Sequence, residues 1–279
     1  MEPRIGLALS GGGARGLAHI GVLKVLEREG IPISCLAGTS MGGVIAAAYA
    51  AGLSVGLIEQ EALRMSQRRH WLSLIDRTPA RRGLLQGQKV TEYLAQWLGH
   101  LTFDQLRLPL ALVAVDLNSE QKVVLRSGSV LTAVRATIAV PGVFTPVELD
   151  GQMLVDGGLL DNLPADVARE MGADVVVAVD VATDNAGVAY LAEQMRRRRF
   201  LPSALADLLD VLYRSLVVTI REANRRSLAE SRPDLLVCPP IPPQVSVFSG
   251  MSLASEVIAS GERAMEEALP ALRRLTTGH

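Results

Sequence analysis

The 279-residue sequence has little aromatic, cysteine or histidine content. Aromatic residues make up 4% of the chain and hydrophobic residues 49%, so a substantial core must be built mainly from Ala, Val, Leu and Ile. The two cysteines, Cys35 and Cys238, lie in apolar surroundings and share no metal-ligand spacing, and we expect both to be reduced core residues. The formal net charge of −1 gives no global field that would favour nucleic acid as a partner.

Long apolar runs are also absent. No uncharged apolar segment approaches the ~20 residues needed to cross a bilayer, and the first apolar run, Ile5–Leu9, is too short for a signal peptide. We therefore expect a cytoplasmic protein, with peripheral contact at the inner membrane face left open. The basic run Arg196–Arg199 is a candidate for that contact, although a solvated charge run is the simpler explanation.

Hydrophobic periodicity indicates alternating strands and helices. A buried strand at 5–9 precedes a glycine loop and a helix at 16–29, and a second strand at 33–37 precedes a helix-prone run at 44–51. This order favours an α/β fold with a mainly parallel central sheet and helices on both faces. We expect one domain over 1–279. Its further elements are a helical insertion at about 54–108 that could cap the carboxyl edge of the sheet, a helix capped by Asn162, and C-terminal helices at about 203–231 and 252–275.

The pentapeptide Gly38-Thr39-Ser40-Met41-Gly42 fits G-x-S-x-G, the pattern of a nucleophile elbow between a strand and a helix. The apolar run before it and the alanine-rich run after it supply that strand and helix. A serine on such a turn presents its hydroxyl outside the sheet, and the following helix directs backbone N–H groups toward developing negative charge. The pattern predicts a serine ester hydrolase with Ser40 as nucleophile, supported by Gly38 and Gly42.

The glycine loop at 10–16 forms a nest of backbone N–H groups that suits an anion, either a phosphate or the oxyanion of a tetrahedral intermediate. Gly11, Gly13 and Gly16 also satisfy the dinucleotide fingerprint G-x-G-x-x-G. That fingerprint requires an acidic residue at the end of the second strand, and none follows Ala37. No Gly-Lys-Ser/Thr of a phosphate-binding loop follows either, so nucleotide binding is disfavoured.

A serine nucleophile needs a base to take its proton. Histidine is the usual base, but no histidine lies between His100 and His279, which argues against the Ser-Asp-His order of α/β-hydrolases. His19 lies in the first helix and is expected to be a packed residue. Asp156 remains, at the end of a strand and before two glycines, because burial can raise a carboxylate pKa toward that of a useful base. A turn that merely begins with Asp-Gly is the alternative.

These motifs together resemble the patatin-like phospholipase family, in the bacterial branch related to neuropathy target esterase. The resemblance rests on the glycine loop 11–16, the elbow 38–42 and the triplet 156–158, which continues into Leu159–Pro164; the block Val140–Phe144 is similar as well. It implies a three-layer α/β/α patatin-like fold and the hydrolysis of acyl esters of phospholipids, lysophospholipids or related lipids, with no metal or other cofactor. It further implies a Ser-Asp dyad of Ser40 and Asp156, and an oxyanion hole formed by the backbone of Gly11, Gly12 and Gly13 with Arg15 beside it.

Other assignments stay open beside that one. A non-catalytic regulator on the same fold and a nucleotide-binding α/β protein are the two alternative classes. Arg15 could orient the loop, pair with a lipid phosphate or lie on a helix surface, and Asp116 is expected to make a structural hydrogen bond. The apolar stripe formed by Leu205, Leu208, Leu209, Leu212 and Leu216 is expected in the core, with an acyl groove or a partner interface as alternatives. The physiological lipid and the oligomeric state are not predicted.

Overall fold

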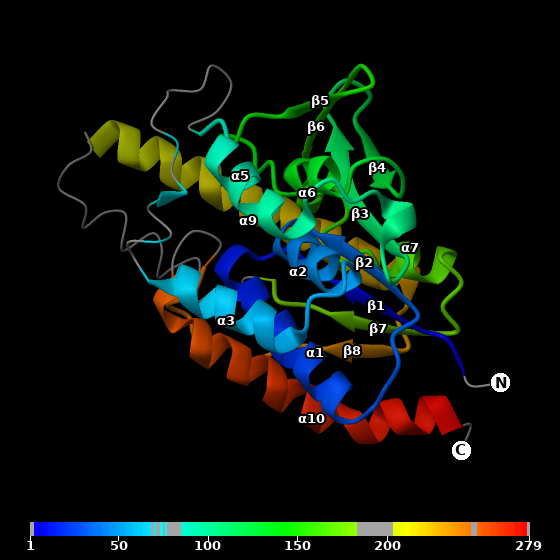
Figure 1. Cartoon of the computed structure of the whole chain (residues 1–279). Coiled ribbons are helices and arrows are strands. Elements are labelled where there is room, and N and C mark those ends of the chain that lie inside the picture. The colour runs from blue at the N-terminus through cyan, green and yellow to red at the C-terminus, as the bar shows by residue number, and fades with distance from the viewer. Residues whose placement is uncertain are drawn as a thin grey trace.

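The chain folds around one sheet in a computed structural model that describes residues 3–67, 85–182, 203–246 and 250–277, together with residues 70, 73, 74 and 76. The strands are β1 Ile5–Leu9, β2 Cys35–Thr39, β3 Leu110–Asp116, β4 Gln121–Leu125, β5 Val147–Leu149, β6 Gln152–Asp156, β7 Val175–Val179 and β8 Leu235–Val237. Within the described residues their order is β5-β6-β3-β2-β1-β7-β8, and β4 pairs with β3 (Figure 1).

The sheet is mainly parallel, as predicted. β3, β2, β1, β7 and β8 run in one direction. β4 and β6 are antiparallel to β3, and β5 completes a hairpin with β6. The hairpin turn contains Asp150, at a positive φ of 50°, and Gly151, at 79°. This Asp-Gly turn reverses the chain so that β6 enters the sheet against the direction of β3.

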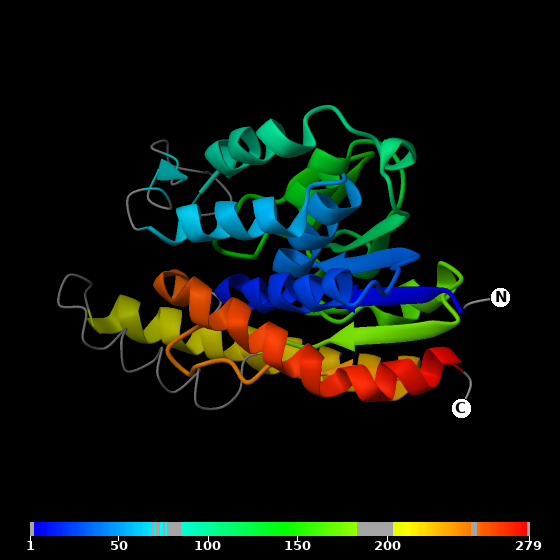
Figure 2. The same cartoon turned by 60° about the horizontal axis from the view of Figure 1, so that its bottom comes forward.

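Helices cover both faces of the sheet. They are α1 Ala18–Arg28, α2 Ser40–Ala50, α3 Val55–Ser66, α5 Gln88–Leu98, α6 Val130–Thr137, α7 Ala165–Glu170, α9 Ser203–Ser231 and α10 Ala254–Thr277. On one face, Leu7, Leu9 and Leu36 pack in a core with helices α1, α2, α3, α5, α6 and α10. On the other face Ala8 and Ala37 pack against α7, with Leu228 of α9 beside them. This is the three-layer α/β/α arrangement that was expected (Figures 1 and 2).

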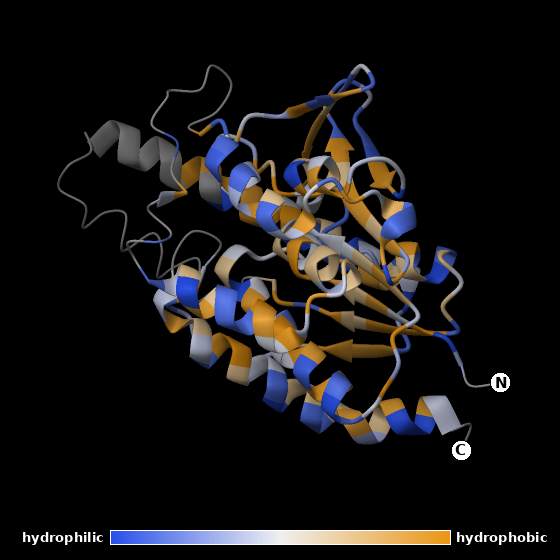
Figure 3. Ribbon diagram, viewed as in Figure 1, coloured by the Kyte–Doolittle hydropathy of each residue, from blue (hydrophilic) through white to orange (hydrophobic). Residues whose placement is uncertain are grey.

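The alternation of side chains along the strands explains the two unequal layers. Successive strand residues point to opposite faces of the sheet. The leucines of β1 therefore lie on one face, and the small residue between them lies on the other. The larger residues meet α1, α2 and α10, whereas the alanines allow the short helix α7 to lie close to the sheet. Figure 3 shows largely hydrophobic strands, with helices α1, α3 and α10 on one side of them, each carrying both hydrophobic and hydrophilic residues. None of the helices in the described residues has both the length and the hydropathy of a bilayer-spanning segment.

The predicted helical insertion at 54–108 contains α3 and α5. Helix α3 packs on α1, α2 and α10, and α5 packs on α2 and α6. Arg135 of α6 donates to the carbonyl oxygen of Gln86 at 2.7 Å, which ties the start of α5 to the sheet layer. The described part of this segment thus lies over the helices of the leucine-rich face.

Two local expectations are wrong. Asn162 does not cap a helix: the residue before α7 is Pro164, and the Asn162 side chain instead donates to Gly11. Cys35 is buried in the core, as expected, but Cys238 is exposed, because it follows the short edge strand β8. Both cysteines are free thiols in the structure.

Helices α1 and α10 cross with their backbones in close contact. A Cβ atom on Gly21 would lie 2.0 Å from the carbonyl oxygen of Ile258, and a Cβ on Gly261 would lie 1.9 Å from that of Ala18. Both atoms met are backbone atoms, which cannot rotate away. Glycine at both positions is therefore a packing requirement of the crossing.

We predict that Gly261→Ala lowers the free energy of unfolding by about 1–3 kcal/mol, the usual cost of forcing an extra methyl group into a packed contact. Gly56→Ala, in exposed helix α3 with nothing within 4 Å of the added Cβ, is the matched control. It should raise the free energy by up to about 1 kcal/mol, because alanine is the better helix former. Urea unfolding of both variants measures the two free energies of unfolding. Equal changes in the two variants would contradict the close backbone contact between α1 and α10.

Candidate active site

The carboxyl ends of the parallel strands bring three segments of chain to one edge of the sheet. The glycine loop follows β1, Ser40 follows β2, and Ala182 follows β7. They meet around a narrow cavity of about 40 Å³. Its lining consists of Gly11, Gly12, Gly13, Ser40, Val140, Pro141, Asp156, Gly158, Leu159, Asn162, Ala182, Leu216, Val217, Ile220 and Arg221. The structure therefore brings the predicted nucleophile, base and glycine loop together, and it adds a wall from α9.

Ser40 occupies a strained turn between β2 and α2. Its φ of 52° lies in the left-handed region that residues other than glycine rarely adopt. The two elbow glycines are required by close approach: a Cβ on Gly42 would lie 2.3 Å from the carbonyl oxygen of Leu9, and one on Gly38 would lie 2.7 Å from Cα of Gly43. This is the geometry of a nucleophile elbow.

Thr137, at the end of α6, holds the elbow from below. The backbone N–H of Ser40 donates to Thr137 Oγ1 at 2.9 Å, and that hydroxyl donates to the carbonyl oxygen of Val113. Thr137 is fully buried. Sequence reasoning missed this residue, because a threonine at a helix end 97 positions away carries no local signal of a contact with the elbow.

Strand register explains how Asp156 reaches Ser40. Thr39 pairs with Val113, so Ser40 is level with Ala114, and Ala114 pairs in turn with Asp156. The serine and the carboxylate therefore flank the same small residue of β3. Gly157 then turns directly over that strand, since a Cβ there would lie 2.4 Å from the carbonyl oxygen of Val113.

The Asp156 carboxyl group is buried, with 6% of the residue exposed. It accepts a hydrogen bond from the N–H of Gly158 at 2.8 Å and interacts with the Ser40 hydroxyl. Burial raises its pKa to about 6, because the charged form loses hydration, and the two hydrogen bonds offset that rise only in part. A carboxylate in this setting is a stronger base than one in water and is still ionised at neutral pH.

The glycine loop differs in detail from the expectation. The N–H of Gly11 donates to the carbonyl oxygen of Asn162 at 3.1 Å, and the N–H of Arg15 donates to that of Gly12 at 3.2 Å. Among the described residues, none accepts a hydrogen bond from the N–H group of Gly12 or of Gly13. Gly13 also has a positive φ of 57°. Gly12 and Gly13 are thus the donors that remain for a ligand in the cavity.

Arg15 and His19 stand behind the loop and do not line the cavity. The Arg15 guanidinium is buried and donates to the carbonyl oxygens of Val181, Ala182 and Val245. Its side chain therefore orients the loops, in line with the first of the three roles considered for it. His19 Nε2 lies 2.8 Å from the Ser10 carbonyl oxygen, and burial lowers the histidine pKa to about 4. His19 is a packed, neutral residue, as predicted.

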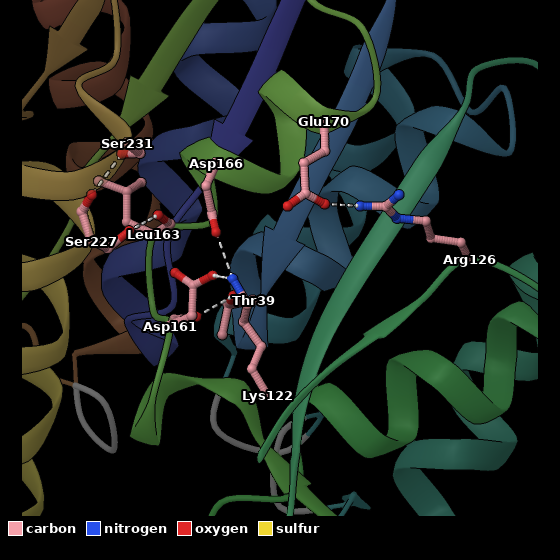
Figure 4. Close-up of polar contacts among 9 residues, drawn as sticks. All are labelled: Thr39, Lys122, Arg126, Asp161, Leu163, Asp166, Glu170, Ser227 and Ser231. Atoms are coloured by element: carbon pink, nitrogen blue, oxygen red, sulfur yellow. Dashed lines mark hydrogen bonds and ion pairs between the residues drawn. The ribbon is translucent and has the colours of Figure 1, made fainter.

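The segment Asp161–Leu163 receives hydrogen bonds from three different elements. Thr39 Oγ1 donates to the carbonyl oxygen of Asp161 at 2.9 Å, and Ser227 Oγ of α9 donates to that of Leu163 at 2.8 Å (Figure 4). The N–H of Gly11 donates to the carbonyl oxygen of Asn162 between them. We call this segment the strap. It joins the elbow, the glycine loop and the α9 wall.

Lys122 fixes the strap to the antiparallel part of the sheet. Its Nζ donates to Asp161 Oδ2 at 3.0 Å and to Asp166 Oδ2 at 2.6 Å (Figure 4). Asp116 also has a structural role, as expected, since it accepts from the N–H groups of Asn118, Ser119 and Met153. No cluster of three or more potential metal ligands occurs in the described ranges. The run Arg196–Arg199 and the side chains of Leu205, Leu208 and Leu209 lie outside what the structure describes.

Comparisons with known proteins show which proteins the chain resembles. The sequence model of the patatin-like phospholipase family matches residues 7–169, more than half of the chain. An uncharacterised NTE family protein of Mycobacterium tuberculosis is 35% identical over 238 residues, which cover 82% of this chain and 61% of that protein. Neuropathy target esterase sws of Drosophila melanogaster is 31% identical over 185 residues, covering 65% of this chain and 13% of that protein. VipD of Legionella pneumophila shares the fold, with a TM-score of 0.59 and 13% identity over 97% of this chain and 67% of that chain.

The chain therefore belongs to the patatin-like phospholipase family. Its similarity to NTE family proteins confirms the branch predicted from the motifs. The chain spans about three-fifths of the length of the mycobacterial relative.

Thr137→Val should lower the free energy of unfolding by about 1–3 kcal/mol, because the Ser40 N–H loses its acceptor and the buried Val113 carbonyl oxygen loses a donor. Thr137→Ser keeps the hydroxyl and should recover most of that loss. Urea unfolding of the two variants beside the wild type measures both values. A valine variant as stable as the wild type would show that the hydroxyl does not hold the elbow.

Asp156→Asn should be more stable than the wild type above pH 6 by about 3 kcal/mol, since one pKa unit corresponds to ~1.36 kcal/mol. The wild-type carboxylate has a folded pKa raised from 3.8 to about 6. Its ionisation therefore favours the unfolded chain, and the wild type loses stability as the pH rises from about 4 to 6. The difference between the proteins should vanish below pH 4. Thermal unfolding across this range measures it, and a pH-independent difference would contradict the raised pKa.

Proposed function

We propose that this chain is a serine lipid acyl hydrolase that cleaves carboxylic ester bonds of phospholipids, lysophospholipids or related acyl esters. The observation that supports it is the convergence of three groups on one cavity. Ser40 lies there at a positive φ, Asp156 lies beside it with a pKa of about 6, and the N–H groups of Gly12 and Gly13 are unused by the described protein.

The reaction proceeds through an acyl-enzyme. Ser40 Oγ attacks the ester carbonyl carbon while Asp156 takes the hydroxyl proton, and the N–H groups of Gly12 and Gly13 stabilise the oxyanion. Asp156 then returns the proton to the departing alcohol oxygen as the ester bond breaks. Asp156 next takes a proton from water, whose oxygen attacks the acyl carbonyl carbon. Asp156 then passes that proton to Ser40 Oγ as the bond between the acyl group and the serine breaks, which releases the fatty acid and restores Ser40. Each oxyanion donor contributes about 3–4 kcal/mol to lowering the barrier.

The remaining cavity wall suits an acyl substrate. Apart from Asn162 and Arg221, the other side chains that line the cavity beside the dyad are apolar: Val140, Pro141, Leu159, Ala182, Leu216, Val217 and Ile220. Such a wall favours the hydrocarbon beside an ester group over a charged substrate. We propose a lipid at this wall, in a cytoplasmic protein that contacts the membrane surface peripherally.

Ser40→Ala and Asp156→Asn should each lower kcat for a short-chain nitrophenyl ester and for a lysophospholipid by several orders of magnitude, because each removes one partner of the proton transfer. Ser255→Ala and Asp104→Asn, both at exposed positions outside the cavity, are the matched controls and should hydrolyse both esters at the wild-type rate.

A fluorophosphonate probe tests the nucleophile separately, by mass spectrometry of the labelled peptide. Labelling at Ser40 that disappears in Ser40→Ala is expected. Undiminished ester turnover in Ser40→Ala would overturn the mechanism. A wild-type protein that neither hydrolyses esters nor takes the label would instead indicate a non-catalytic member of the family.

The value of kcat/KM should fall on the acid side with a midpoint near pH 6, because this quantity follows the free enzyme's essential base and Asp156 must be ionised to accept a proton. Rates measured from pH 4.5 to pH 8.5 in buffers of constant ionic strength test this. A midpoint near 4, the ordinary value for aspartate, would contradict the buried carboxylate as the base.

A further inference from the structure

Asn162 lies between the two halves of the proposed active site. Only 2% of it is exposed, and it forms part of the cavity lining. A Cβ atom on Gly11 would lie 2.4 Å from Asn162 Oδ1, and a Cβ on Gly158 would lie 3.0 Å from the same oxygen. The amide therefore fills the space between the glycine loop and the loop that follows Asp156. Glycine at 11 and at 158 is what makes that space large enough.

Asn162 makes a hydrogen bond with each of the two polar backbone groups of Gly11, the N–H and the carbonyl oxygen. The carbonyl oxygen of Asn162 accepts from the N–H of Gly11 at 3.1 Å, and Asn162 Nδ2 donates to the carbonyl oxygen of Gly11 at 3.3 Å. The first bond depends on the backbone alone and survives any substitution. The second depends on the side-chain amide and can be removed by mutation.

Peptide geometry transmits the second bond to the cavity. The carbonyl of Gly11 and the N–H of Gly12 belong to one planar trans peptide unit and point in opposite directions. A donor that fixes the Gly11 oxygen on the strap side therefore fixes the Gly12 N–H on the other side. Gly12 lines the cavity, and its N–H is one of the two donors that no described residue uses.

We propose that Asn162 is a positioning residue of the lipid hydrolase, whose side-chain amide holds the Gly11–Gly12 peptide so that the Gly12 N–H is aimed at the oxyanion. The proposal rests on the hydrolase function proposed above. It assigns the Asn162 side chain to the transition state, because the oxyanion exists only after Ser40 has attacked, and not to the binding of the ester.

The strap suits this role because it also holds Ser40. Thr39, next to the nucleophile, donates to the carbonyl oxygen of Asp161, one residue before Asn162. The distance between nucleophile and oxyanion donor is thus set through adjacent residues of one segment. Lys122 anchors that segment through the Asp161 carboxylate.

The test compares Asn162→Ala and Asn162→Asp with Asn224→Ala, a control at an equally buried asparagine that lies outside the cavity and donates to Asp180. Asn162→Ala should lower kcat for a nitrophenyl ester by about 10- to 100-fold, less than the ~10²–10³-fold loss on deleting a donor. Its KM should stay within about twofold, because the ground-state ester does not use the donor. Asn224→Ala should retain the wild-type kcat.

An alkyl trifluoromethyl ketone supplies an independent readout. Ser40 adds to its carbonyl carbon, Asp156 receives the proton, and the resulting hemiketal oxyanion occupies the donor site. Its inhibition constant should rise in Asn162→Ala by the same factor as kcat/KM falls, as expected of a transition-state analogue. A change in packing alone would not make the two quantities move together.

Asn162→Asp keeps the shape of the side chain but loses the N–H donor, so it serves if the alanine variant fails to fold. The new carboxylate would stand beside Gly158, which donates to Asp156, and like charges disfavour each other's ionisation. The acid-side midpoint of kcat/KM should therefore move upward in Asn162→Asp and stay in place in Asn162→Ala. Arg221, the other charged residue of the cavity lining, is the same in every variant.

Wild-type kcat in both Asn162 variants would overturn the assignment, as would a loss confined to KM. Those outcomes would leave the hydrolase intact, provided that Ser40→Ala remains inactive. A wild-type chain without esterase activity would instead overturn the proposed function itself, so the two failures are distinguishable.

Discussion

The geometry of the site depends on three consecutive backbone carbonyl groups, those of the strap Asp161–Leu163. Each accepts a hydrogen bond from a different part of the fold: the elbow, the glycine loop and helix α9. A backbone carbonyl cannot rotate away as a side chain can, so three such contacts in a row define the relative positions of the three elements. The Lys122 ammonium holds the segment on its outer side. Loss of this order would separate the serine from the loop even if every individual motif stayed folded.

The burial of the Asp156 carboxylate lowers the stability of the folded chain at neutral pH. A carboxylate with a pKa raised to about 6 is destabilising when ionised, yet the proposed role of Asp156 as a base requires this raised pKa. Ser40 at a positive φ adds backbone strain at the neighbouring position. Both features persist because the surrounding contacts, from Thr137 below and the strap above, leave the chain no room to relax.

Local patterns in the sequence predicted the strand at Ile5–Leu9, the helix at about 203–231 and the three motifs that converge on the cavity. Contacts between distant residues could not be predicted in this way. Asn162 reads as a helix cap, because Asn before Pro is a common start signal, and only the folded chain shows its amide against Gly11. Arg15 stands next to a glycine loop in sequence, but its long side chain reaches backward to Val181 and Val245. Thr137 has no sequence signal at all.

The apolar α9 residues of the cavity lie outside the part of the chain that the family model matches. The glycine loop, Ser40 and Asp156 all lie within residues 7–169, the part matched by the family model, whereas Leu216, Val217 and Ile220 lie beyond it. The groups proposed to react thus lie in the part of the chain that the family model matches, whereas the apolar α9 side of the cavity lies outside that range. Under the proposed function, substitutions at these α9 positions would change the apolar side of the cavity without altering Ser40, Asp156 or the glycine loop.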